Sequence, residues 1–595
     1  MEVKERIERL RELMKEEEVQ AYLVPSTDPH HSEYLPEFWK RRQFISGFTG
    51  SAGDVVIASD EAGLWTDGRY FIQAEEQLKG TGMDLYKMGM PEVPKIEEWI
   101  ADKLAGGGVL GVDPGLLSIE SSSKLKKVLS EKEASIKYIE RNLVDEIWED
   151  RPSPSEAPLE VLPTDHTGES IQDKLNKIRE KLNKKDCTAH VLCALDTIAW
   201  TFNMRGKDIE FNPVFISYAV ITSDEAHLFI DEKKVTNDVK DHLGDLVKIH
   251  PYQDIGGFMK EMAENDHRVW IDPKTTNRWL MIPLEGKVKV HKERSPVTDL
   301  KSVKNETELK GFRKCLITDG VAMVKFLKWL EETVPEGGVT EISASDKLES
   351  FRKEGEDFVG LSFTTIAGYA EHGAIVHYDP TPETDVELKT EGIFLLDSGG
   401  QYLTGTTDIT RTVTLGHPTE EQREMFTRVL KGHIGIATLK FPKGFSGKQL
   451  ELPARKSLWD VGKNYNHGTG HGVGHYLNVH EGPMGLTPRD IGVPLQAGNV
   501  LSNEPGYYKE GKYGIRIENL IVVRKDEKLS SEDSEFLGFE TITFCPIDLK
   551  LIDREIMTDE EVEWFNDYHR QVFDNLSPHL DENHKNWLKD RTAEI

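Results

Sequence analysis

The chain has few cysteines, no long apolar run and no excess of positive charge, and each absence excludes a class of protein. Its four cysteines, none in a Cys-x-x-Cys pair, argue against a disulfide framework and predict buried free thiols in a reducing compartment. No stretch approaches the roughly 18 consecutive apolar residues of a membrane-spanning helix, so we expect no membrane association. The formal net charge of −30 argues against nucleic acid as a partner, because binding phosphate groups requires a basic face.

The two ends of the chain carry no apolar segment of the kind that directs a protein to a membrane or out of the cell. Residues 1–6 lead into a charged helix without the apolar centre of a secretory signal. Residues 592–595 form no hydrophobic tail for a lipid anchor. We therefore expect a cytoplasmic protein.

The length of 595 residues exceeds what one hydrophobic core supports, so two or three domains are expected. Two parts of the chain show the same order of elements: apolar residues at steps of 4, 3 and 4, which predict an amphipathic helix, and then an apolar strand. The helical positions are Val3, Ile7, Leu10 and Met14 in one part and Ile171, Leu175, Ile178 and Leu182 in the other. Residues 59–67 also match residues 223–231 at six of nine positions. We predict two copies of one α/β domain.

Prolines and a helix-capping pair predict the boundaries between the domains. Residues 151–158 contain three prolines, which block regular structure and predict a linker. The second copy ends near residues 294–296, and Asn305 with Glu308 predicts the start of a helix that opens a third domain. The predicted domains are 1–155, 156–300 and 301–595.

Five candidate metal ligands lie in the third predicted domain, each within a short phrase of glycines or apolar residues. They are Asp397, Asp408, His471, Glu504 and Glu518. Carboxylates beside apolar strands cost several kcal/mol unless they are paired or metal-bound. We expect Asp397 and Asp408, 11 residues apart, to lie side by side on a hairpin. Four carboxylates and one imidazole can hold two divalent ions, which lower the pKa of a bridging water, so the pattern predicts a metal-dependent hydrolase.

Three further histidines, His377, His467 and His480, lie in comparable phrases. Each fits an ordinary loop histidine, and each also fits a group that assists a developing oxyanion. The residues alone leave both interpretations open.

Together these phrases resemble aminopeptidase P, the X-Pro aminopeptidase of the pita-bread metallopeptidases, in its three-domain cytosolic form. The resemblance extends over nearly the whole chain and includes phrases that flank the ligands as well as the ligand phrases. These are residues 32–34 (SEY), 44–53 (FISGFTGSAG) and 65–71 (WTDGRYF), 203–206 (NMRG) and 212–215 (NPVF), and 337–341 (GGVTE) and 478–483 (NVHEGP).

The resemblance implies an α/β fold class with two related, creatinase-like N-terminal domains and a C-terminal pita-bread α+β catalytic domain with a curved, mostly antiparallel sheet. It implies that the five candidates are ligands of two divalent ions, Asp408 and Glu518 bridging them, and it favours Mn²⁺. An oxygen-rich ligand set suits Mn²⁺, although affinity alone also admits Co²⁺ or Zn²⁺.

The resemblance also assigns roles in catalysis. The implied reaction releases the N-terminal residue from peptides with proline second, through attack of a metal-activated hydroxide on the X-Pro bond. Glu504 would carry the proton, and His377 and His480 would position the substrate or stabilise the tetrahedral intermediate. His467 would line the substrate site, and Arg69 would reach it from the first domain.

Two alternatives and two details stay open. Prolidase cuts only X-Pro dipeptides, whereas the duplicated N-terminal domains favour longer peptides. A catalytically inactive pita-bread binding protein would have lost ligands, and all five stand in this chain. The resemblance implies a homodimer with Trp459 at the contact, although a partly buried core tryptophan fits equally. Ser502 and Asn503 precede Glu504 where the family often has threonine and an acidic residue, which predicts altered surroundings for that ligand.

Overall fold

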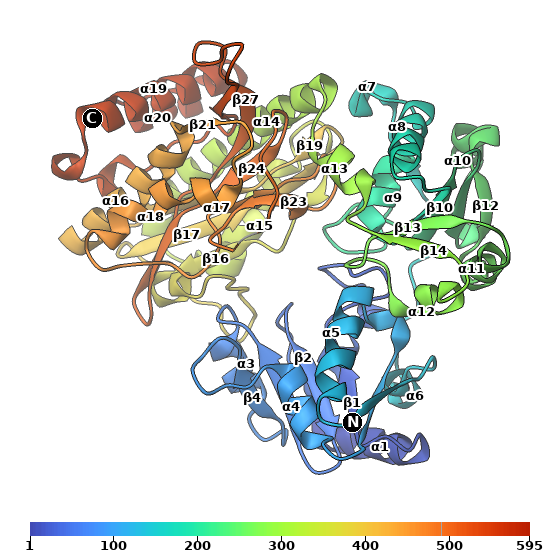
Figure 1. The fold of residues 1–595 in the computed structure, drawn as a ribbon. Helices are drawn as coiled ribbons and strands as arrows, with labels where there is room; N and C mark the ends of the chain where they lie inside the picture. The colour runs from blue at the N-terminus through green and yellow to red at the C-terminus, as the bar shows by residue number, and fades with distance from the viewer. Residues whose placement is uncertain (490) are drawn as a thin grey trace. The chain divides into compact units, whose positions relative to one another are not determined.

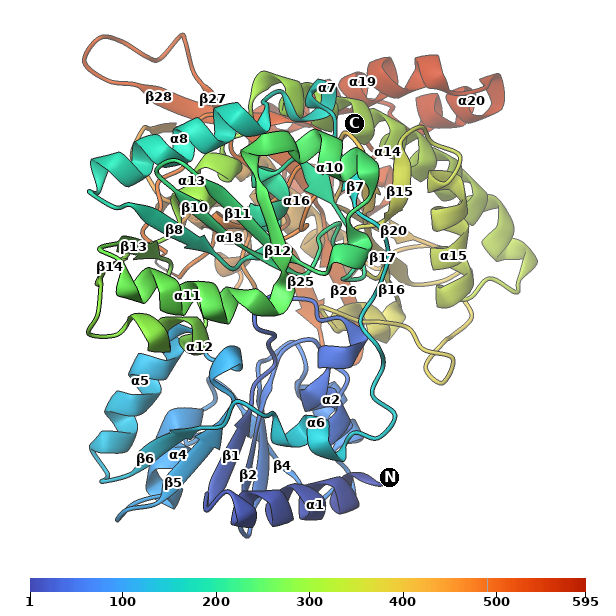
Figure 2. The same cartoon turned by 90° about the vertical axis from the view of Figure 1, so that its right-hand side faces the viewer.

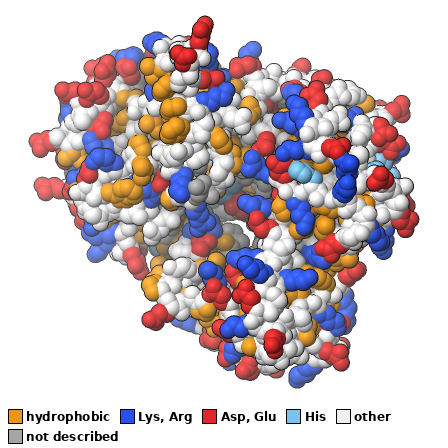
Figure 3. All heavy atoms as spheres, in the orientation of Figure 1, with side chains coloured by type: hydrophobic (Ala, Val, Ile, Leu, Met, Phe, Trp, Pro, Cys, Tyr) orange, Lys and Arg blue, Asp and Glu red, His pale blue; other side chains and the backbone are white. Residues whose placement is uncertain are grey.

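The computed structural model describes residues 1–489 and 491–595, which divide into two units (Figure 1). The N-terminal unit comprises residues 1–162, 169–210 and 214–297, and the catalytic unit comprises 163–168, 211–213 and 298–595. Within the described residues, none of the helices has both the length and the apolar character needed to cross a bilayer. Acidic and basic side chains are intermixed on the face drawn in Figure 3.

The N-terminal unit contains two six-stranded sheets of identical topology, which confirms the predicted duplication. The strand orders are β4-β3-β2-β1-β5-β6 and β12-β11-β10-β8-β13-β14. In each sheet the first strand pairs antiparallel with the second and parallel with the fifth. The first sheet comprises β1 (Ala21–Val24), β2 (Asp54–Ala58), β3 (Ala62–Thr66), β4 (Asp84–Lys87), β5 (Val109–Val112) and β6 (Ser135–Tyr138). The second comprises β8 (Ala189–Leu192), β10 (Ser217–Thr222), β11 (Ala226–Ile230), β12 (Lys248–Pro251), β13 (Arg268–Ile271) and β14 (Lys289–Lys292).

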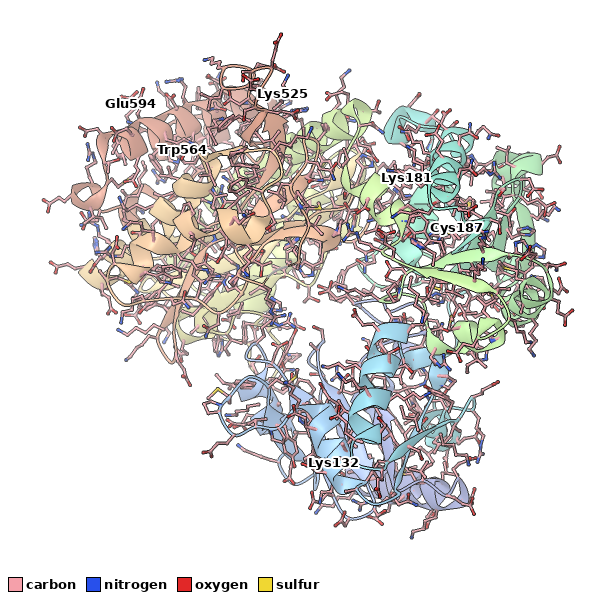
Figure 4. The ribbon with its side chains drawn as sticks, viewed as in Figure 1. Lys132, Lys181, Cys187, Lys525, Trp564 and Glu594 are labelled. Atoms are coloured by element: carbon pink, nitrogen blue, oxygen red, sulfur yellow. The ribbon has the colours of Figure 1, made fainter. Side chains whose placement is uncertain are left out.

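The repeated sequence patterns build equivalent parts of these two domains. The helices predicted from steps of 4, 3 and 4 are α1 (Val3–Glu16), which lies beside β1 and β2 (Figure 2), and α8 (Ile171–Lys184). The matching turns at the start of residues 59–67 and 223–231 also form equivalent backbone hydrogen bonds. The amide of Ser59 donates to Gln20 O over 3.1 Å, and that of Ser223 donates to Thr188 O over 3.1 Å. All four cysteines are buried and free, among them Cys187 (Figure 4).

At the predicted linker and at the start of the third predicted domain, the local structure follows the sequence pattern. Residues 151–159 form neither helix nor strand, as the prolines indicate. Helix α13 (Pro296–Ser302) precedes α14 (Glu306–Thr333), and Asn305 caps α14 by accepting the amide of Glu308 over 3.0 Å. The sequence did not indicate that two short segments belong to the catalytic unit. They are held by Asn305 Nδ2, which donates to Thr167 O over 2.8 Å, and by Gln401 Nε2, which donates to Phe211 O over 2.9 Å.

The catalytic unit is built on antiparallel strands flanked by helices, as the resemblance implied (Figures 1 and 2). One sheet has the order β16-β17-β20 and another the order β21-β28-β27-β24-β22-β23. Their bounds are β16 (Ile366–Tyr369), β17 (Ile393–Ser398), β20 (Ile409–Thr414), β21 (Lys440–Pro442), β28 (Phe536–Thr541), β27 (Asn519–Lys525), β24 (Val500–Asn503), β22 (Gly470–Gly472) and β23 (Glu481–Leu486).

Smaller strands and the helices complete this unit. The short strands are β15 (Phe358–Leu361), β18 (Gly400–Tyr402), β19 (Gly405–Thr406), β25 (Gly506–Lys509) and β26 (Tyr513–Arg516). The helices include α15 (Glu341–Arg352), α16 (Glu420–Ala437), α18 (Leu452–Trp459), α19 (Asp559–Leu576) and α20 (Glu582–Arg591). Phe394 and Leu396 of β17 pack against α14 and α15, so the apolar run before Asp397 is core.

Candidate metal centre

Asp397 lies on β17 and Asp408 immediately precedes β20, the neighbouring strand, although the connection between them differs from the prediction. Strand β17 pairs antiparallel with β20, and Asp397 lies opposite Thr410. The expected simple hairpin is wrong, because the chain between the strands forms a second hairpin, β18–β19, in a separate sheet with β15. Gly399 marks this departure: a Cβ there would lie 2.0 Å from Thr407 O, so only glycine permits the close approach.

The other three candidates come from a different sheet, in which their strands are neighbours. His471 lies on β22, Glu504 follows β24, and Glu518 immediately precedes β27. Strand β24 pairs with both β22 and β27, so the three segments lie in a row. The amide of Glu518 donates to Thr410 O over 3.1 Å and joins this row to β20. The structure therefore brings residues far apart in sequence to one place.

The distances describe a tight cluster. His471 Nε2 lies 3.3 Å from Asp408 Oδ2 and 3.5 Å from Glu504 Oε1. Asp408, His471 and Glu518 each offer one atom within 4.8 Å of the others, a spacing at which all three can reach a single ion. Asp397, Asp408 and Glu518 are at most 8% exposed. The cluster is thus a buried set of carboxylates around one imidazole.

Three residues orient these carboxylates, and each stands two positions from a candidate ligand; of the three, the sequence analysis noted only Ser502. Thr410 Oγ1 donates to Glu518 Oε2 over 2.7 Å. Ser502 Oγ donates to Glu504 Oε1 over 3.1 Å and accepts the amide of His471 over 3.0 Å. Arg516 Nη2 donates to Asp397 Oδ2 over 2.6 Å. Side chains at i and i+2 of extended chain face the same side, so this alternation was the signal that could have found them.

Burial and mutual repulsion shape the electrostatics of the site. Burial raises the pKa of the carboxyls of Asp397, Glu504 and Glu518, and the charges of Asp408 and neighbouring carboxylates raise that of Glu518 further. Burial lowers the pKa of His471, but the hydrogen bond with Asp408 and the charge of Glu504 outweigh it and raise that pKa to about 9. The contributions of neighbouring carboxylates to the pKa values of Glu518 and His471 indicate a negative local potential, which favours cations.

The donor set fits divalent metal ions. Among the described residues, Asp397 Oδ1 is buried and has no hydrogen-bond partner, although leaving such an oxygen without a donor is costly. In the part of the chain that the structure describes, Arg516 forms an ion pair with Asp397, and its guanidinium together with the imidazole of His471 does not balance four carboxylates. Carboxylate oxygens with one imidazole nitrogen are the ligand types of hard and borderline divalent ions.

The unusual pair before Glu504 is accommodated by two different contacts. Ser502 supplies the hydroxyl that links Glu504 to His471, so the threonine of the family is not needed for that bond. Asn503 is buried with its amide directed to α16, where Nδ2 donates to His433 O over 2.9 Å. A carboxylate at this position would bring two acceptors together at His433 O, so the amide is the better match here.

Of the histidines expected at the substrate site, His480 contacts His471 directly, and His467 is linked to the cluster through a hydrogen-bond network. His480 packs edge-on against His471 with ring centroids 4.3 Å apart. His467 Nε2 lies 2.8 Å from Tyr508 Oη, which accepts from Arg516 Nη1 over 2.7 Å, so this histidine joins the network that ends at Asp397. Burial lowers the pKa of His467 to about 3 and keeps the ring neutral.

The two remaining candidates lie in other surroundings. His377 is half-buried in the loop after η8 (Ala370–Ala374), and its neighbour Tyr378 donates to Glu341 Oε2 over 2.9 Å. Arg69 belongs to the N-terminal unit and forms a two-point ion pair with Asp67, with Nε–Oδ1 at 2.8 Å and Nη2–Oδ2 at 2.7 Å.

Known families match almost the entire chain. The Creatinase/Prolidase N-terminal domain matches residues 6–143 and again 150–308. Metallopeptidase family M24 matches residues 310–525, and the C-terminal region of peptidase M24 matches 535–595. The double match agrees with the two sheets of identical topology.

Full-length relatives narrow the family further. A probable Xaa-Pro aminopeptidase P of Paracoccidioides brasiliensis is 45% identical over 99% of both chains. The crystal structure of an X-prolyl aminopeptidase of Caenorhabditis elegans, described as a cytosolic enzyme with a di-nuclear active site, is 39% identical with a TM-score of 0.96 over 100% of both chains. The Xaa-Pro dipeptidase of Bacillus anthracis, at 22% identity and a TM-score of 0.52, covers 64% of this chain and shares the fold. The chain belongs to the Xaa-Pro aminopeptidase P family of M24 metallopeptidases.

Proposed function

We propose that this protein is an Xaa-Pro aminopeptidase, which releases the N-terminal residue from peptides whose second residue is proline. The observation that carries the proposal is the cluster of four carboxylates and one histidine, in which Asp397, Asp408 and Glu518 are buried, in a chain that matches named Xaa-Pro aminopeptidases from end to end. The di-nuclear site described for the Caenorhabditis elegans enzyme supports the same chemistry.

The metal centre is proposed to hold two divalent ions through Asp397, Asp408, His471, Glu504 and Glu518. Asp408 and Glu518 are proposed to bridge them, and Mn²⁺ is the proposed metal because the donor set is rich in oxygen. When bound, two such ions supply a water of lowered pKa and a positive charge that polarises the carbonyl before proline.

The protein side chains have separate proposed roles in this reaction. Glu504 carries the proton from the attacking water to the departing proline nitrogen. His480, packed on His471, and His377 donate to the carbonyl oxygen as negative charge develops on it. His467 lines the substrate site from the Tyr508–Arg516 network, and Arg69 is the proposed contact for the peptide beyond proline.

Two other functions are less well supported. A dipeptidase fold accounts for only 64% of this chain, whereas the aminopeptidase relatives account for the duplicated N-terminal domains as well. An inactive binding protein does not need a complete set of buried, mutually repelling carboxylates. The proposed domains are 1–155, 156–300 and 301–595, and the proposed location is the cytoplasm, as described for the Caenorhabditis elegans enzyme.

Three peptides test the substrate proposal directly. With added Mn²⁺, Arg-Pro-Pro is expected to be cleaved at least about a hundredfold faster than Arg-Ala-Ala, because a site shaped for proline does not rely on the N–H that proline lacks. Arg-Pro is expected to be a poorer substrate than Arg-Pro-Pro, and the matched variant Arg69→Ala should lower kcat/KM for the tripeptide more than for the dipeptide. Equal cleavage of the first two peptides would remove proline specificity, and cleavage of Arg-Pro alone would identify a dipeptidase.

A homodimer formed through the catalytic domain is the second proposal. Trp459 ends α18 and is 49% exposed, although its indole N–H donates to Asn464 over 3.0 Å. Leu452 on the same helix is 51% exposed and Val461 just beyond it 36%, so the apolar surface here is larger than one residue. An exposed tryptophan among apolar neighbours is a common anchor of protein interfaces.

Trp459→Glu is expected to weaken the dimer at least about thirtyfold, because a charge would be buried at the contact. Sedimentation velocity at micromolar concentration should show a dimer for the wild type and a monomer for the variant. Leu529→Glu, at another exposed apolar residue of the same unit, is the matched control and should leave the dimer intact. A monomeric wild type contradicts the dimer, and an unchanged dimer in Trp459→Glu contradicts the contact.

A further inference from the structure

A buried group of three charges lies next to the catalytic histidines, outside the proposed metal ligands. Lys301 Nζ donates to Glu481 Oε2 over 2.5 Å, and Lys304 Nζ donates to Glu481 Oε1 and, over 3.0 Å, to Lys301 O. The three side chains are at most 2% exposed. We refer to Lys301, Lys304 and Glu481 as the lysine clamp.

In the lysine clamp two ammonium groups contact the same carboxylate, and all three side chains are shielded from water. Desolvation of charged groups is expensive, and replacing such a group by apolar residues is often neutral or stabilising. Stability is therefore a poor explanation for the clamp, and a fixed position for Glu481 is a better one.

Glu481 stands where two catalytic segments meet. It follows His480 directly and lies opposite Gly472 in the pairing of β23 with β22. A Cβ at Gly472 would lie 2.3 Å from Glu481 O, so the two backbones are in close contact. Gly472 follows His471, and its carbonyl oxygen accepts a hydrogen bond from His471 Nδ1 over 2.9 Å. A displacement of Glu481 would therefore move His480 and the backbone that orients His471.

The segment that supplies the lysines also holds the strand that leads to Glu504. The amide of Lys304 donates to Gly498 O over 2.9 Å. The side chain of Asn499 donates through Nδ2 to Ser302 O over 2.9 Å, and β24 begins at the next residue. Residues 301–304, at the end of α13 and just beyond it, thus contact both Glu481 at the start of β23 and the residues that precede β24.

We propose that Glu481 is a positioning residue, and that Lys301 and Lys304 hold it so that His480 meets the substrate carbonyl while His471 keeps its orientation. The inference rests on the proposed aminopeptidase function. It assigns a catalytic purpose to α13 and the residues after it, which fall within the match to the second creatinase-type domain at residues 150–308. The end of that match is then part of the active-site scaffold of the next domain.

Glu481→Gln in the full-length protein tests this role, because the amide keeps the shape and loses the charge that both lysines bind. We expect kcat for Arg-Pro-Pro to fall at least about tenfold, with KM nearly unchanged and the metal content of the chain retained. In a protein labelled at histidine Cε1, the His480 signal, assigned with His480→Gln, should shift or broaden in the metal-loaded and the metal-free protein.

A matched control separates positioning from general stability. Asp208→Asn breaks another fully buried lysine–carboxylate pair, with Lys234 in the N-terminal unit, whose side chains are at most 3% exposed. It should lower the Tm by a similar amount without changing kcat or the His480 signal. Lys304→Met leaves the Lys301–Glu481 pair in place, so it should fold even if Glu481→Gln does not. It should lower kcat and shift the His480 signal by less than Glu481→Gln.

The outcomes are distinct. The proposal is overturned if Glu481→Gln keeps the wild-type kcat and an unshifted His480 signal, whatever its Tm. If Glu481→Gln does not fold, the same result in Lys304→Met overturns the proposal. An equal loss of kcat in Asp208→Asn also overturns it. A wild-type protein that does not cleave Arg-Pro-Pro refutes the proposed function instead, while the His480 signal still decides whether the clamp positions that ring.

Discussion

Asp408→Ala is expected to lose bound divalent metal and at least about a thousandfold of the peptidase activity while the catalytic unit stays folded. Asp408 contacts His471 at 3.3 Å and shares the cluster with Glu518, so its removal leaves a gap in the middle of the donor set. The fold should persist because the variant removes one of several buried carboxylates that repel each other. Glu518→Ala is expected to behave in the same way.

Elemental analysis and peptide assays on the same preparations check this result. Asp548→Asn is the matched control, because Asp548 is a largely buried acid of the same unit whose carboxylate accepts the amides of Thr414 and Lys550 at 2.9 and 3.0 Å. It should keep its metal and its activity. Two ions per chain in an active Asp408→Ala protein would contradict the assignment of Asp408 as a bridging ligand.

Arg411→Met is expected to lower the free energy of unfolding of the catalytic unit by about 3–5 kcal/mol. Arg411 is 1% exposed and donates to six acceptors, none of them a carboxylate. They are the carbonyl oxygens of Thr410, Glu518, Cys545 and Pro546, the side-chain oxygen of Asn519 and the hydroxyl of Tyr568. Methionine fills much of the volume but removes all six of these buried hydrogen bonds, although Thr410 O still accepts the amide of Glu518 and Cys545 O the hydroxyl of Tyr568.

The same substitution should weaken metal binding, because two of those acceptors belong to the backbone around proposed ligands. Glu518 O and Thr410 O are held over 2.7 and 2.8 Å, and Tyr568 reaches Arg411 from α19, where it stacks on Trp564. Urea denaturation of the metal-free protein measures the stability, and metal titration measures the affinity.

Arg313→Met is the control for Arg411→Met. Arg313 is 33% exposed and pairs with Glu540, so its loss should cost no more than about 1 kcal/mol. Comparable losses in the two variants would show that the loss of an arginine charge, rather than the loss of six buried hydrogen bonds, determines the cost.

Several elements were predictable because their determinants are local. The steps of 4, 3 and 4 that place Ile7, Leu10 and Met14 on one side of α1 require only helical periodicity. The capping of α14 by Asn305 depends on residues three apart. The five candidate ligands were also found early, because acidic residues at the ends of apolar strands stand out without knowledge of which strands pair.

Other features depend on contacts between residues far apart, for which the chain carries no periodic signal. The insertion of the β18–β19 hairpin between Asp397 and Asp408 reflects pairing with β15, so the prediction of a simple hairpin failed. The inclusion of residues 163–168 and 211–213 in the catalytic unit depends on Asn305 and Gln401.

The composition, the duplicated pattern and the ligand phrases therefore established the kind of protein and the atoms available for metal binding. The tertiary structure decided how those atoms are held, because orientation is a property of partners that arrive from distant strands. Arg516 meets Asp397 across 119 positions, and Lys301 meets Glu481 across 180. The attraction within such pairs is strengthened by a low local dielectric constant, which exists only once the sheets and helices have packed together.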